Sequence, residues 1–348
     1  MHIPENYLSP STCATMFAVM APVWYVSAKK VKVQIEKKKE TVVQLGMGAS
    51  LAFLIMMFNV PVPGGTTAHA VGSALLAILL GPWAACLSVT MALILQAFLF
   101  GDGGILCLGA NAFNMAFIIP FLGYGIFLLC RKIFKKHGDK IGAFAGGYIG
   151  IVCAAFMCGV ELGIQPLLFK NSHGNPLYCP YPLRISVPAM VGVHLIIGLI
   201  EGTITLAVYS YIKKVAPQTI YHASDYLNTE VSKTQNSGMK IWKKTIIAII
   251  AVALIFTPLG LIASAPAWGE WNASEILTQL RKYHLNAVVP DAFKHGQGYH
   301  AAFDGYAIPG MNHGIEAVLG YILCGITAIV IFLLVAKILS AFVKSKEE

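Results

Sequence analysis

The stretch that decides the fold runs from Ala70 to Phe100, "AVGSALLAILLGPWAACLSVTMALILQAFLF". It contains no Asp, Glu, Lys or Arg, and Gly81-Pro82 divides it into two apolar blocks, 70–81 and 83–100. An uncharged apolar block of about 18 residues has the length of a membrane-spanning helix. Lipid offers the backbone no hydrogen-bond partner, so a chain in lipid must be helical. The stretch predicts one short and one full-length membrane helix.

The rest of the chain has the same character. Of its 348 residues 57% are hydrophobic and only 12% are charged, against about 25% charged in soluble proteins. The sequence therefore predicts an all-α polytopic membrane protein. Besides the two spans above, we expect spans at 9–28, 41–58, 112–130, 141–168, 186–211, 245–265 and 315–336.

Lysine and arginine set the expected orientation. If the N-terminus lies outside, the inner segments 29–40, 131–140, 212–244 and 337–348 hold 20 of the 25 Lys and Arg residues. This asymmetry follows the positive-inside rule. It predicts a multi-pass protein of the plasma (inner) membrane with a cytoplasmic C-terminus. The net charge of +9 is then explained by loops beside anionic lipid, and no nucleic-acid partner is needed.

A polar, lysine-containing segment divides the chain. Residues 213–244 are low in apolar side chains and are predicted to form a cytoplasmic linker. They separate a seven-span module, 1–212, from a two-span module, 245–348. The second module has an outer loop at 266–313, for whose histidines the sequence gives no clear role.

The chain begins "MHIP", and its first atoms are candidate ligands. No Lys or Arg precedes Lys29, so the start lacks the positive region of a signal peptide and we expect it to be retained. A free Met1 amine, the His2 amide nitrogen and His2 Nδ1 can close a five-membered and a six-membered chelate ring on one metal ion. A planar nitrogen set favours Ni²⁺ or Cu²⁺. Such binding should weaken as the pH falls, because the ligands must be deprotonated.

A second outer histidine can supply a fourth nitrogen. The loop 59–69 reads "NVPVPGGTTAH"; its prolines favour an extended chain and its paired glycines permit a tight turn. Thr66 or Thr67 is expected to cap the helix that follows. The topology predicted from the lysine distribution places His69 on the same side of the membrane as Met1.

Four segments resemble a known family: "MHIPENYLSP", "NVPVPGGTTAHAVGSALLAILLGPWAA", "FGDGGILCLGANAFNMA" and "GVHLIIGLIEGTITLAV". They look like the substrate-specific (S) component of cobalt/nickel energy-coupling-factor (ECF) transporters, the CbiM/NikM family, over about residues 1–215. The resemblance implies a seven-helix bundle with a buried N-terminus. It also implies an ion held by Met1, His2 and His69, and partners that are ATPase subunits and a transmembrane coupling (T) subunit. "TPLGLIASAPAWGEW" resembles, less closely, the small accessory subunit, here fused.

Other polar residues within or beside the spans have two interpretations each. Thr66, Thr67, Gln96, Asn111 and Asn114 either support the metal ligands or make ordinary hydrogen bonds between helices. His194 and Glu201 are seven positions apart and share a helix face. They are expected to form a structural pair or to act in the transport cycle, and the role of Glu161 stays open.

The predicted function is to capture Ni²⁺ or Co²⁺ outside and to translocate it inward as a subunit of an ATP-driven transporter. The metal is the transported substrate, and no cofactor is expected. The chain lacks a Walker A motif and the HExxH and GxSxG enzyme motifs. We therefore expect no enzymatic activity in this chain and ATP hydrolysis in partner chains. The alternative is a proton- or ion-coupled secondary permease with Glu161, His194 and Glu201 as a relay. The sequence does not decide between nickel and cobalt.

Overall fold

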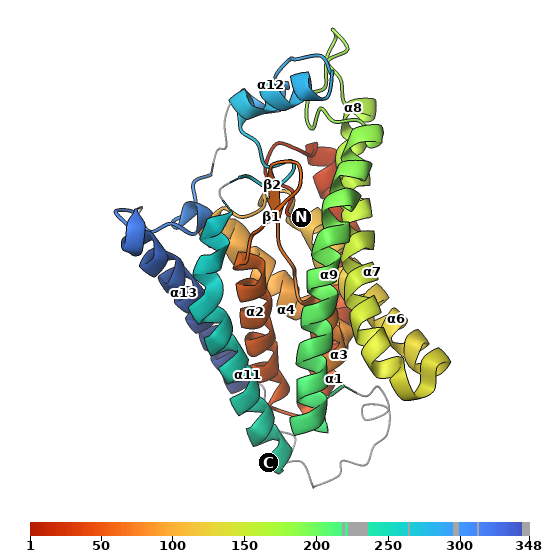
Figure 1. The fold of residues 1–348 in the computed structure, drawn as a ribbon, viewed down its shortest axis with the longest axis vertical. Helices are drawn as coiled ribbons and strands as arrows, with labels where there is room; N and C mark the ends of the chain where they lie inside the picture. The colour runs from red at the N-terminus through yellow and green to blue at the C-terminus, as the bar shows by residue number, and fades with distance from the viewer. Residues whose placement is uncertain (218–219, 222–235, 264, 295–298, 312, 343–348) are drawn as a thin grey trace.

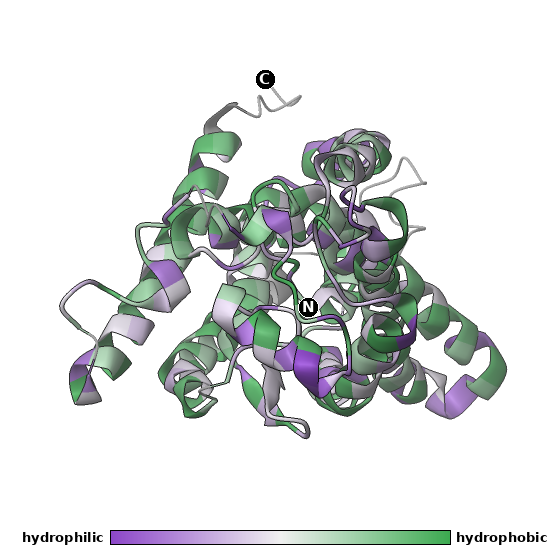
Figure 2. Cartoon of the chain, turned by 90° about the horizontal axis from the view of Figure 1, so that it is seen from above, coloured by the Kyte–Doolittle hydropathy of each residue, from purple (hydrophilic) through white to green (hydrophobic). Residues whose placement is uncertain are grey.

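The computed structural model describes residues 1–217, 220–221, 236–263, 265–294, 299–311 and 313–342. It is an elongated bundle of helices with a small hairpin and a short helix at one end (Figure 1). The N-terminus lies inside the bundle, toward that same end. Large apolar side chains such as Leu129, Ile255 and Ile338 are exposed, and hydrophobic residues cover outward sides of the helices (Figure 2). The all-α polytopic membrane fold is confirmed.

Every predicted span is helical over most of its length. Six helical stretches of the described residues are long and apolar enough to cross a membrane. The helices of the first module are α1 Pro10–Lys37, α2 Thr41–Met57, α3 Ser73–Leu80, α4 Pro82–Leu95, α5 Leu108–Ala112, α6 Ile119–Phe134, α7 Gly138–Gly163, α8 Gln165–Leu168 and α9 Leu183–Val215. Those of the second are α11 Asn236–Phe256, α12 Ala273–Lys282 and α13 Gly314–Phe342.

Several helices differ from the predicted spans at their ends. Helix α1 continues to Lys37 and α9 to Val215, because a polar turn stays helical after the apolar block has ended. Helix α4 passes into a π-helical turn, η1, over Gln96–Phe100, and α5 passes into another, η2, over Phe113–Ile118. Such turns shift the side-chain register and are frequent at functional sites.

The loop between α2 and α3 is a β-hairpin. Strands β1 Val60–Val62 and β2 Thr66–Ala68 pair antiparallel. The expectation that Thr66 or Thr67 caps the next helix is wrong, because α3 begins only at Ser73, with Gly72 at its N-cap. The Thr66 and Thr67 hydroxyls donate instead to the carbonyls of Pro266 and Ala265, at 2.9 and 3.0 Å. The hairpin is therefore bonded to the second module.

Helices α11 and α13 of the second module pack on α2 (Figure 1). A Cβ placed on Gly46 of α2 would lie 2.9 Å from Ala336 Cβ and 3.0 Å from the Phe332 carbonyl oxygen of α13. Glycine therefore permits the close approach of these two helices. Of the segment 213–244 that was predicted as a linker, residues 218–219 and 222–235 lie outside the described residues.

Helices α6 and α7 also approach closely at glycine. A Cβ on Gly146 would lie 2.5 Å from the Gly123 carbonyl oxygen, and one on Gly123 would lie 2.9 Å from the Gly146 carbonyl oxygen. This is the small-residue contact by which helices associate in lipid without a hydrophobic driving force.

We predict that Gly146→Ala lowers the free energy of unfolding by about 1–3 kcal/mol, because the added methyl overpacks a backbone contact. Gly125→Ala is the matched control on α6, since a Cβ there meets nothing within 4 Å. Denaturant titration of both variants in detergent measures the effect. Equal stabilities of the two variants would contradict the close α6–α7 contact.

Candidate functional site

The first three residues are buried inside the bundle. The exposed fractions of Met1, His2 and Ile3 are 3%, 4% and 0%. The side chain of Asn111 bonds to both backbone groups of Ile3. Its Oδ1 accepts from Ile3 N at 2.7 Å, and its Nδ2 donates to the Ile3 carbonyl at 3.1 Å. Gly104 N donates to the same carbonyl at 2.9 Å. The chain start is therefore fixed through its backbone.

His69 reaches the chain start from the loop between β2 and α3. Glu201 of α9 positions this loop, because its carboxylate accepts from Val71 N and Gly72 N at 2.8 and 3.0 Å. His69 Nδ1 lies 3.0 Å from the Ala70 carbonyl oxygen. A carbonyl only accepts, so Nδ1 carries the proton and Nε2 keeps its lone pair. That Nε2 lies 3.2 Å from His2 Nδ1.

The His2 ring is oriented by Gln96. His2 Nε2 lies 3.3 Å from Gln96 Oε1, while Gln96 Nε2 donates to Asp102 Oδ2 at 3.3 Å. Because a carboxylate only accepts, the amide nitrogen must face Asp102 and the amide oxygen must face His2. His2 Nε2 then carries the proton and Nδ1 keeps a lone pair. Burial and the charge of the Met1 amine lower the pKa of His2 to about 3, so the ring is neutral.

Three acceptor atoms therefore converge with no proton between them. His2 Nδ1 lies 3.2 Å from His69 Nε2 and 3.1 Å from Asp102 Oδ1. Buried acceptors that face one another without a donor cost free energy, and a cation among them removes that cost. Two adjacent nitrogens on a square-planar metal lie about 2.9 Å apart, given metal–nitrogen bonds of about 2.0–2.1 Å. The observed separation is close to this value.

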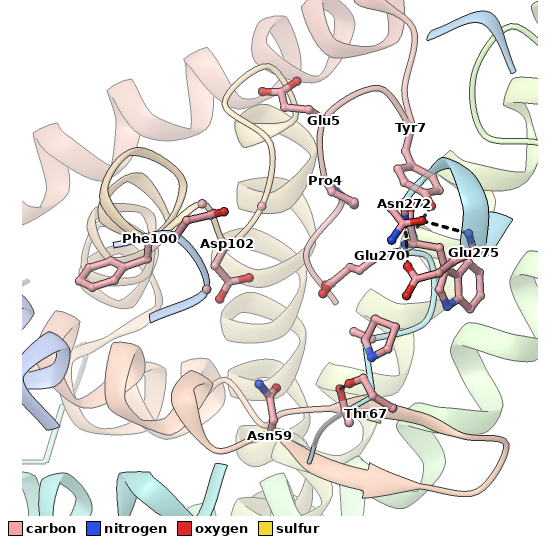
Figure 3. A pocket seen from close by; sticks show the side chains of 18 of the residues that line it. Pro4, Glu5, Tyr7, Asn59, Thr67, Phe100, Asp102, Glu270, Asn272 and Glu275 are labelled. Atoms are coloured by element: carbon pink, nitrogen blue, oxygen red, sulfur yellow. Dashed lines mark hydrogen bonds between the residues drawn. The ribbon is translucent and has the colours of Figure 1, made fainter. Parts of the chain in front are cut away.

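A pocket of about 680 Å³ opens onto this convergence. Its lining includes Thr67, His69 and Asp102 from the first module and Glu270 and Tyr306 from the second. Figure 3 shows Asp102 and Glu270 on opposite sides of it. Burial and the Asp102 charge raise the pKa of Glu270 to about 7, although the Met1 amine acts to lower it. The pocket therefore brings the carboxyl groups of Asp102 and Glu270 together with the imidazole of His69.

Three residues at the site, Asp102, Glu270 and Tyr306, were not predicted from the sequence. Asp102 had a usable signal, because it is the first charged residue after the uncharged stretch 70–100. Glu270 and Tyr306 had none, because they lie more than 160 positions away from Asp102 along the chain and only the fold brings them to it.

The residues predicted to support the ligands take different positions. Gln96 contacts the His2 ring directly, and Asn111 holds the backbone of Ile3. Asn114 donates to Glu161 Oε2 at 2.7 Å, which is a contact between helices. Thr66 and Thr67 bond to the second module, as described above.

The expected pair of His194 and Glu201 does not form. His194 Nδ1 lies 2.8 Å from the Met190 carbonyl oxygen, while Glu201 bonds to the backbone at Val71 and Gly72. Residues seven apart share a helix face but lie about 10 Å apart along the axis, so sharing a face does not bring them into contact. Glu161 bonds to Asn114, and within the described residues the hydrogen bonds of Glu161, His194 and Glu201 form no continuous relay.

The fold and the site together define a class: a multi-pass α-helical membrane protein with a cation-suited donor set at its buried chain start. The family model "Cobalt uptake substrate-specific transmembrane region" (CbiM) matches residues 2–219, and the model "PDGLE domain" matches residues 243–345. The chain belongs to the CbiM family and carries a fused PDGLE domain.

The chain is similar to two fused transport proteins and to a solved transporter structure. The "Probable fused nickel transport protein LarMN" of Lactiplantibacillus plantarum is 49% identical over 97% of both chains. The "Fused nickel transport protein NikMN" of Rhodobacter capsulatus is 39% identical over 80% of this chain and 78% of its own. A crystal structure described as a truncated transition metal transporter is 55% identical, with a TM-score of 0.58, and covers 62% of this chain and 99% of its own.

We predict that Asn111→Ala releases the chain start. Losing both bonds leaves the buried Ile3 N–H without its acceptor, at a cost of about 1–3 kcal/mol. An added aminopeptidase should then trim the N-terminus roughly tenfold faster. Asn286→Ala is the control, because the Asn286 side chain is exposed and donates to Asn175 Oδ1 at 3.2 Å. Equal trimming of the two variants would show that Asn111 does not hold the segment.

Proposed function

We propose that this chain captures Ni²⁺ or Co²⁺ from outside and passes it inward as the substrate-specific subunit of an ATP-driven transporter. The observation that carries the proposal is the approach of His2 Nδ1 to His69 Nε2 at 3.2 Å. The other nitrogen of each ring faces an acceptor, Gln96 Oε1 or the Ala70 carbonyl. The relatives named as nickel transport proteins support the same class of substrate.

The proposed ligands are the Met1 amine, the His2 amide nitrogen, His2 Nδ1 and His69 Nε2. Two of the four belong to the main chain, and Asn111 and Gly104 hold that main chain at Ile3. Binding requires a free Met1 amine and the loss of the amide proton of His2. The planar nitrogen set favours nickel on geometric grounds, while cobalt accepts the same ligands.

The pocket supports capture from outside. It leads to His69 and carries the carboxyl groups of Asp102 and Glu270, which attract a dication and balance its charge within a buried site. The lysine distribution predicts that this end of the bundle faces outward.

The energy for transport is proposed to come from ATPase subunits through a membrane-embedded coupling subunit. The alternative, a secondary permease, loses its main structural support, because Glu161, His194 and Glu201 bond to separate groups.

For binding, we predict that His2→Ala weakens Ni²⁺ binding by about 10²–10⁴-fold, because it removes the ring nitrogen that closes the six-membered chelate ring. His69→Ala should also weaken binding. The control is His173→Ala, because His173 is exposed and its backbone N–H donates to Asn171 Oδ1. Titration calorimetry on the purified chain with a native N-terminus measures the affinities. Unchanged affinity after His2→Ala would rule out the terminal chelate.

For energy coupling, we predict that ⁶³Ni²⁺ uptake into proteoliposomes requires the partner subunits and ATP, and that a protonophore leaves it unchanged. The control omits the ATPase subunits. Uptake by this chain alone, driven by a proton gradient and abolished by the protonophore, would favour the secondary permease instead.

A further inference from the structure

We infer that Tyr306, from the second module, is a positioning residue that sets which nitrogen of His2 carries the proton and which keeps its lone pair for the metal. This inference rests on the proposed function, because it concerns the same site. It gives the fused module a chemical role in metal binding, exerted through the side chain of Gln96.

A loop of the second module forms hydrogen bonds with the backbone of the first module close to Gln96. Phe303 N donates to the Leu99 carbonyl at 2.9 Å, and Tyr299 Oη donates to the Phe98 carbonyl at 2.5 Å. Both acceptors belong to the π-helical turn η1, which begins at Gln96. The loop therefore docks on the turn that carries the residue orienting His2.

Tyr306 itself is held in a defined conformation. It is buried, and its ring stacks on Phe100 with centroids 5.1 Å apart and also contacts Phe53 and Tyr321. Its φ of 61° lies in the left-handed region, which a bulky side chain adopts only at some cost in free energy. The packing of the ring and the bonds of the hydroxyl hold it there.

The hydroxyl of Tyr306 joins the two residues beside His2. It accepts from Gln96 Nε2 at 2.9 Å and donates to Asp102 Oδ2 in a short bond. Burial and the neighbouring carboxylate raise the pKa of Tyr306 well above its usual value, so the hydroxyl keeps its proton. With both bonds made, the amide nitrogen of Gln96 points toward Tyr306 and Asp102, and its oxygen points toward His2 Nε2.

Removing the hydroxyl loosens this arrangement. Gln96 loses one of its two acceptors, and Asp102 Oδ2 loses a donor. Only the 3.3 Å bond to Asp102 Oδ2 then fixes the Gln96 amide, and Asp102 has itself lost a short bond that held it. Once Asp102 moves away, a glutamine amide rotated by 180°, which has nearly the same shape, presents N–H to His2 Nε2. His2 would then carry its proton on Nδ1, the nitrogen proposed to bind the metal. The tautomer that binds metal therefore depends on a residue of the fused module.

The test is titration calorimetry with Ni²⁺ on the full chain with a native N-terminus. Tyr306→Phe keeps the ring and should weaken binding about 10–100-fold, as loss of an orienting partner typically does. Tyr321→Phe is the matched control, because its hydroxyl donates to the Met57 carbonyl at 2.7 Å and its ring adjoins that of Tyr306. At saturating Ni²⁺ the d–d absorption band of Tyr306→Phe should match that of the unmodified chain, because the ligands are the same.

A double-mutant cycle separates positioning from packing. In a Gln96→Met background, Tyr306→Phe should cause little further loss of affinity, because the hydroxyl acts through Gln96. Additive losses would overturn the inference, and so would equal affinities of Tyr306→Phe and Tyr321→Phe. Either result leaves the proposed function in place if His2→Ala still abolishes binding. If His2→Ala leaves the affinity unchanged, the proposed function itself fails.

Discussion

Two neutral imidazoles face each other across 3.2 Å with no proton between them, and the architecture around the chain start maintains that arrangement. Each ring has its other nitrogen committed to an acceptor, the Ala70 carbonyl for His69 and Gln96 Oε1 for His2. In a buried site such unpaired acceptors are costly, so the surrounding contacts must hold them in place. Asn111 does this for the first residues, and Glu201 does it for the loop that carries His69.

The second module is part of the same arrangement. Its loop accepts hydrogen bonds from Thr66 and Thr67 of the hairpin before His69, and Tyr7, six residues after the start, donates to the Trp271 carbonyl at 3.1 Å. Tyr306 reaches Gln96 and Asp102. The three segments that build the site, namely the chain start, the hairpin and the turn after α4, thus each contact the second module. Fusion of the two modules keeps these contacts within one chain.

The parts of the site that could be predicted follow from covalent spacing and topology. His2 is adjacent to the amine because it is the second residue, and His69 was placed on the same face by the lysine count. Gln96 was a candidate because a polar residue in an apolar span needs a partner. The pairing of His194 with Glu201 failed because periodicity gives direction around a helix and says nothing of contact along it. The capping role of Thr66 or Thr67 failed because the loop forms a hairpin and reaches the second module.

The sequence by itself determined the helical membrane fold, since lipid leaves an uncharged chain no other way to satisfy its backbone. It also determined the chemical types of nitrogen donor available at the chain start. The tertiary structure alone decided which lone pairs meet. The position of each lone pair depends on the hydrogen-bond partners of the imidazole nitrogens and of the Gln96 amide. Two of those partners, Asp102 and Tyr306, are 204 residues apart in sequence. Their approach depends on how the two modules pack, which no local pattern in the sequence records.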